Sequence, residues 1–194
     1  MYESLIQYIQ NYSSILLSQA EIETIKNSFI PKKLRKKQYF LQEGDVCKYF
    51  AFIVKGAMRQ YSVDDKGIEH IVHLSIENWW VGDRESYIML TPSIYNIDAW
   101  EDTELLTITR ADQLNLLEKI PAIASMIRQM DERNAIANQC RLNAAISNTA
   151  EKRYEDFANR HPEFIQRFPQ HLIASHLGIT KTSLSRIRNQ SMQK

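Results

Sequence analysis

Residues 170–190, near the C-terminus, carry cationic and hydroxyl side chains at spacings that suit hydrogen bonding to a polyanion. Gly178 separates two short segments with helical apolar spacing, and glycine readily takes the left-handed conformation of a tight reversal. In the second segment Leu184 and Ile187 share one face, so the opposite face is free to present donors to base edges in a DNA major groove. The predicted contact residues are Lys181, Thr182, Ser185, Arg186 and Asn189 for bases, Thr180 as the helix cap beside them, and Arg188 and Lys194 for phosphates.

The charge of the chain is concentrated at this end. Residues 165–194 contain five basic and no acidic residues, a formal charge of +5, so residues 1–164 carry −4 within a total of +1. A solvated basic tail would account for the charge alone. Charge and helical spacing together favour a helix-turn-helix that binds nucleic acid.

The elements before this segment change type twice along the chain. Residues 1–30 have helical apolar spacing, and Ser18 with Glu21 forms a capping-box pattern for a second helix. From Pro31 to about Ile108, short runs rich in aromatic and β-branched residues alternate with glycine turns. The expected strands lie at 39–42, 49–54, 57–63, 70–76 and 105–108, which predicts an antiparallel sandwich, roll or barrel and an α+β fold.

A long helix is predicted from Ala122 to about Ile146, because Pro121 suits its first turn and no glycine or further proline interrupts it. An apolar stripe along it is either an intramolecular packing face or a dimer seam. Another helix is expected at about 149–160. The expected domains are 1–146 and 147–194. The stripe residues that would form the dimer interface are Ile123, Ile127, Met130, Asn134 and Ala137, continuing to Arg141 and Ala144.

Other classes of protein find little support in the residues. Cys47 and Cys140 are far apart and have no CxxC partner, which indicates reduced thiols and a cytoplasmic protein. No apolar run approaches the length of a membrane helix. His70 and His73 would face opposite sides of a strand, so no metal site is expected. Walker, HExxH and GxSxG motifs are absent from the sequence, so no enzyme is expected.

Two stretches, LQEGDVCKYFAFIVKGAMRQY (41–61) and IASHLGITKTSLSRIR (173–188), resemble the Crp/Fnr family of bacterial transcription regulators. The resemblance implies an antiparallel β-roll (jelly-roll) sensory domain with the cyclic-nucleotide-binding-domain fold, a long dimerisation helix at about 122–146, and a C-terminal helix-turn-helix. It also implies a homodimer that binds a double-stranded DNA operator and contacts RNA polymerase. The family's base-contacting positions match Lys181, Thr182 and Arg186, and Thr182 departs from the glutamate of cyclic-AMP-responsive members.

The resemblance is weaker at the effector pocket, whose matching positions are Gly82, Asp83, Tyr95 and Asn96. Cyclic-AMP-binding members have Gly-Glu and Arg-Ser pairs there, and a neutral phenol cannot replace a guanidinium on a phosphate. Arg84 is a second source of a cation. Cyclic AMP and cyclic GMP are therefore disfavoured, an iron–sulfur cluster is excluded because no cysteine precedes Cys47, and the effector is unknown. The alternative is a cyclic-nucleotide sensor subunit whose C-terminal helices bind protein rather than DNA.

Overall fold

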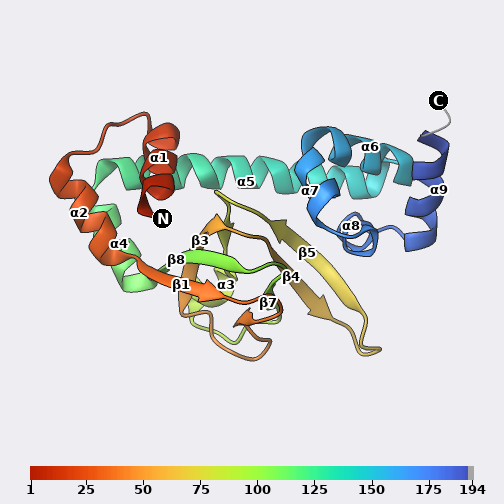
Figure 1. Cartoon of the computed structure of the whole chain (residues 1–194), viewed down its shortest axis with the longest axis horizontal. Helices are drawn as coiled ribbons and strands as arrows, with labels where there is room; N and C mark the ends of the chain where they lie inside the picture. The colour runs from red at the N-terminus through yellow and green to blue at the C-terminus, as the bar shows by residue number, and fades with distance from the viewer. Residues whose placement is uncertain (192–194) are drawn as a thin grey trace. The chain divides into compact units, whose positions relative to one another are not determined.

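The computed structural model describes residues 1–191 and divides into two compact units. The first unit contains Met1–Gln60 and Ser75–Asn134; the second contains Tyr61–Leu74 and Ala135–Lys194. Figure 1 shows the order of elements along the chain. The second unit thus begins within the long helix, whereas the sequence led us to expect a domain boundary at 146/147. That boundary remains a prediction.

Two four-stranded sheets form the β-roll, which confirms the predicted α+β fold. One sheet has the order β1-β8-β3-β6 and the other β2-β7-β4-β5. The β1–β8, β3–β8, β3–β6 and β2–β7 pairs are antiparallel, and Ala51 of β3 lies opposite Thr107 of β8. The strands are β1 (Ile30–Leu34), β2 (Tyr39–Leu41), β3 (Tyr49–Lys55), β4 (Met58–Val63), β5 (Glu69–Ser75), β6 (Trp80–Val81), β7 (Asn96–Ala99) and β8 (Thr103–Thr109).

Helices before and after the roll complete the core of the first unit. The Ser18 hydroxyl accepts the Glu21 N–H, and the Glu21 carboxylate accepts the Ser18 N–H, as the capping-box pattern predicts. Apolar residues of these helices, such as Ile9 and Ile25, are buried together with Phe52 of β3. The helices are α1 (Tyr2–Ser13), α2 (Gln19–Ser28), α3 (Arg84–Met89), α4 (Arg110–Lys119) and the start of α5 (Pro121–Ser147).

The second unit contains the C-terminal helices and the β4–β5 turn region. Its helices are the end of α5, then α6 (Ala150–Arg160), α7 (Pro162–Arg167), α8 (Gln170–His176) and α9 (Lys181–Ser191). Phe157 of α6 stacks on Phe164 of α7, with ring centroids 5.9 Å apart. Over the described residues, the helices are all too short or too polar to span a bilayer.

Candidate nucleic-acid interface and effector pocket

The turn between α8 and α9 has the geometry expected from Gly178. This residue has φ +63°, in the left-handed region that β-branched residues resist. The Gly178 N–H donates to the Ser175 carbonyl at 3.0 Å, and the Ile179 N–H donates to the Ala174 carbonyl at 2.9 Å. These bonds satisfy the last carbonyls of α8 while the chain reverses direction.

Helix α9 is capped and braced from one side. The Thr180 hydroxyl accepts the Ser183 N–H at 3.1 Å, as expected for a cap. Leu184 and Ile187 are fully buried, and α9 packs on α6 and α8. The sequence therefore identified correctly which face of this helix turns inward.

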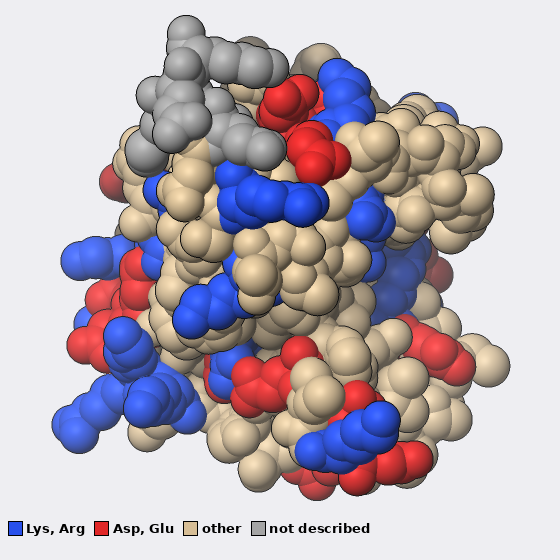
Figure 2. Space-filling model, turned by 90° about the vertical axis from the view of Figure 1, so that its right-hand side faces the viewer, with Lys and Arg blue, Asp and Glu red and all other residues tan. Residues whose placement is uncertain are grey.

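The outward face of α9 presents most of the predicted contact residues together. Arg186 is exposed, and its Nη2 lies 3.8 Å from the Glu151 carboxylate of α6, a long, solvent-screened ion pair. Figure 2 shows basic side chains on the face viewed, with acidic side chains beside them. Lys194 lies outside the described residues. The exposed residues are Thr180, Lys181, Thr182, Ser185, Arg186 and Asn189, while Arg188 is half-buried.

Helix α8 is fastened to β5 inside the second unit. The Ser175 hydroxyl accepts the Ile71 N–H at 2.9 Å and donates to the Glu69 carbonyl at 3.2 Å. Arg141 of α5 donates to the Val72 carbonyl at 2.7 Å. These three bonds hold α8 and α5 against the backbone of β5, the last strand of its sheet.

His176, next to Ser175, makes the second unit sensitive to acid. Burial lowers the pKa of His176 to about 3, and the positive charge of Arg141 adds to this effect. Its Nδ1 is buried without a hydrogen-bond partner among the described residues. Because an unfolded histidine titrates near pH 6.5, the unfolded chain binds a proton that the folded chain excludes at pH values between about 3 and 6.5.

We therefore expect the free energy of unfolding to be fully retained above pH 6.5 and to fall as the pH decreases below it. The loss due to His176 is on the order of 1 kcal/mol per pH unit. Thermal unfolding of the wild type at pH 7 and pH 5 measures it. His176→Gln should show a smaller fall between the two pH values, whereas an equal fall in both proteins would contradict this role of His176.

The residues predicted to form the effector pocket are engaged in local structure. The Asp83 carboxylate accepts the backbone N–H groups of Glu85 and Ser86, which caps the short helix α3, and it accepts the Ser93 hydroxyl at 2.7 Å. Helix α3 was not anticipated from the sequence. Asp83 thus places a negative charge on the same amides that an anionic group would need.

The other predicted pocket residues also have structural partners. A Cβ at Gly82 would overlap the Phe50 ring, so packing requires glycine there. Arg84 donates two bonds to the Asp131 carboxylate of α5, at 2.5 and 2.6 Å. The Asn96 carboxamide oxygen accepts the Glu43 N–H at 3.1 Å, and Tyr95 is half-buried. The side-chain polar atoms of Asp83, Arg84 and Asn96 therefore already have hydrogen-bond partners within the chain.

The first and last parts of helix α5 differ in how far their apolar side chains are buried. In the first unit, Ile123 is buried in the core, and Ile127 packs against that core. The stripe that the sequence left open as packing face or dimer seam is intramolecular at these positions. Asn134 and Ala137 are exposed, and Met130 is half-buried. In the second unit, the large apolar residues of α5 that are exposed are Ile136, Leu142 and Ile146, at 62%, 63% and 77% of full exposure.

Comparisons with known proteins agree with this architecture. Residues 31–120 match the family model of the cyclic nucleotide-binding domain. A search of curated proteins found no match. Three solved structures with similar folds are FixK2 from Bradyrhizobium japonicum, a protein from Eubacterium rectale named for the Crp/Fnr family of transcriptional regulators, and the c-di-GMP-responsive global regulator CLP from Xanthomonas campestris.

The similarity extends over most of each chain but is low in sequence. FixK2 is 18% identical, with 85% of each chain covered and a TM-score of 0.70. The Eubacterium rectale protein is 17% identical over 91% of this chain and 85% of that one, with a TM-score of 0.65. CLP is 11% identical over 91% and 92%, with a TM-score of 0.66. Residues 31–120 thus resemble the cyclic nucleotide-binding domain, and the chain as a whole shares the fold of FixK2 and of the Eubacterium rectale protein.

Proposed function

We propose that this chain is a homodimeric transcription regulator that binds double-stranded DNA through α9. The observation that carries the proposal is an exposed row of donors on α9, braced by buried Leu184 and Ile187 behind it. Lys181 and Arg186 can donate to guanine O6 and N7, while hydroxyl and amide side chains can bond to either purine. The solved structures with this fold support the proposal through architecture alone.

The exposed apolar residues of α5 support the proposed dimer. Ile136, Leu142 and Ile146 are too exposed to contribute to the core of their own chain, and a second copy of the helix would cover them. Two α9 helices related by a two-fold axis would enter successive major grooves about 34 Å apart.

Cyclic AMP remains a disfavoured effector. A cyclic phosphate needs cationic and N–H donors, but Asp83 already occupies the amides at the start of α3. Arg84 is held by Asp131, and Tyr95 offers no positive charge.

Selection of bound sequences from random duplex DNA tests the proposal. A two-fold symmetric consensus is expected, with affinity that falls steeply as salt increases, because Lys and Arg release counterions from the phosphates. Weak affinity with little salt dependence would overturn DNA binding and favour a sensor subunit whose C-terminal helices bind protein.

Arg186→Ala separates base recognition from phosphate contact. We expect it to weaken binding to the selected site by about 1–3 kcal/mol and to relax preference at one base pair of each half-site. Arg188→Ala is the matched control on the same helix, and it should weaken binding similarly on all sequences. Equilibrium binding to the selected site and to a scrambled duplex measures both. A uniform loss for Arg186→Ala would show that Arg186 contacts phosphate only.

A further inference from the structure

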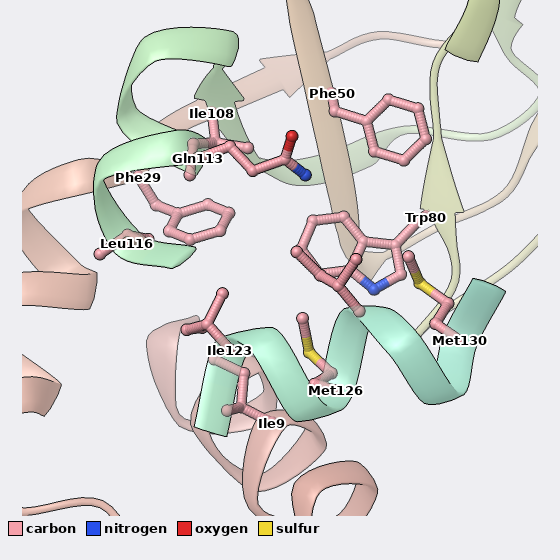
Figure 3. A pocket seen from close by; sticks show the side chains of 11 residues that line it. Ile9, Phe29, Phe50, Trp80, Ile108, Gln113, Leu116, Ile123, Met126 and Met130 are labelled. Carbon is pink, nitrogen blue, oxygen red and sulfur yellow. The ribbon is translucent and has the colours of Figure 1, made fainter. Parts of the chain in front are cut away.

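A cavity in the first unit is lined by none of the residues predicted to bind an effector, although its Phe50 packs against Gly82. It has a volume of about 20 Å³ and is lined by residues of α1, the β-roll, α4 and α5, together with Phe29 directly after α2. Figure 3 shows the Trp80 ring between Phe50 and the methionines of α5, with the Gln113 side chain extending toward the same space. Its lining is apolar except for the indole N–H of Trp80 and the carboxamide of Gln113.

Both polar groups at the cavity have hydrogen-bond donors to spare. The Trp80 Nε1–H is buried and makes no hydrogen bond of standard geometry within the described part of the chain, although it lies close enough to the Tyr8 hydroxyl to oppose the rise that burial causes in the pKa of that phenol. The Gln113 carboxamide oxygen accepts from Arg110 Nη1 at 2.8 Å, which orients its NH₂ group the other way. A buried donor without a well-placed acceptor costs free energy, so a molecule that accepts a hydrogen bond from Trp80 would be stabilised here, and the NH₂ group of half-buried Gln113 is a second donor.

The remaining walls limit the chemistry of an occupant. No lining side chain carries a charge, so a charged molecule would lose its hydration without compensation. The present volume holds a group about the size of one water molecule, and a larger occupant has to displace side chains. Met126 and Met130 of α5 line the cavity and are flexible and unbranched, so they can move at low cost.

We propose that this cavity binds a small uncharged molecule that is mostly apolar and carries one hydrogen-bond acceptor, held by Trp80 and Gln113. The site is independent of the DNA interface, because all of its residues belong to the first unit. Met126 and Met130 come from α5, so occupancy acts directly on the side chains that this helix packs into the core.

The test uses cyclohexanone and cyclohexane as matched probes on the full-length protein without DNA. Methionine methyl groups labelled with ¹³C report binding by NMR. Cyclohexanone should shift the Met126 and Met130 signals saturably, while the exposed Met89 of α3 stays unchanged as an internal control. Cyclohexane should bind more weakly. Absence of a saturable shift with cyclohexanone, or equal affinity for the two probes, would overturn the proposal.

Two variants assign the donors. Trp80→Phe keeps an aromatic ring but removes the N–H, and it should weaken cyclohexanone binding about fivefold without weakening cyclohexane binding. Gln113→Leu should have the same selective effect and serves if Trp80→Phe does not fold. Unchanged affinity for cyclohexanone in a folded variant would remove that donor from the site. Since no DNA is present, these results are separate from the outcome of the DNA-selection experiment.

Discussion

Gly178→Val should abolish specific DNA binding while leaving the first unit folded. Valine at φ +63° is strained by about 1–3 kcal/mol, and relief of that strain requires the turn between α8 and α9 to change. The side chain itself would find space, since the nearest atom to a Cβ there is Arg153 Nη1 at 3.9 Å. The expected defect is therefore a misdirected α9 rather than a clash. Binding assays combined with circular dichroism measure it.

Gly44→Val is the matched control for this substitution. Gly44 also has a positive φ, of +88°, and a Cβ there would meet nothing within 4 Å, but the residue lies in the first unit. The control should lower stability by a similar amount and leave the DNA affinity of the folded protein unchanged. Normal DNA binding by Gly178→Val would show that α9 does not depend on the turn.

Replacing Ile136 and Leu142 together by Asp should convert the dimer into a monomer. Two carboxylates on the exposed apolar face of α5 would repel their counterparts on a second copy and remain hydrated in the monomer. DNA affinity should then fall about a hundredfold or more, because the second half-site no longer binds intramolecularly. Sedimentation velocity and DNA titration measure the two effects.

Leu114→Asp provides the comparison for the dimer experiment. Leu114 is an exposed leucine of α4, at 48% of full exposure, so the substitution adds a similar charge at a site away from α5. This variant should sediment as the wild type does. If the double α5 variant also kept the wild-type sedimentation coefficient, the dimer interface would have to lie elsewhere.

Local signals in the sequence located most elements well. The Ser18–Glu21 pattern, the Thr180 cap and Pro121 at the start of α5 all appear in the structure as expected. These signals depend on residues within one helical turn of each other, which is why they can be recognised in a single chain. The predicted strands likewise overlap β2, β3, β4, β5 and β8.

Other features depend on contacts between distant segments and could not be anticipated. Strand β6 has only two residues, too few to give a pattern, and β1 contains Pro31 and two lysines, an unusual composition for a strand. The apolar stripe of α5 has the same residue spacing whether it packs within its own chain or against a second copy. The sequence pattern alone therefore cannot distinguish the two. The resemblance placed Asp83 in the effector pocket, whereas its contacts to the Glu85 and Ser86 amides are a local cap and its contact to Ser93 depends on the fold.

The attachment of Ser175 and Arg141 to β5 also leaves fewer free backbone groups on a terminal strand. A terminal strand with free backbone groups is a template on which another chain can add a strand. Here a hydroxyl and a guanidinium occupy backbone groups of Glu69, Ile71 and Val72. A substitution that loosened α8 would therefore also free backbone groups of β5 for pairing with another chain. This consequence limits how far the contacts between α8 and β5 can weaken during evolution.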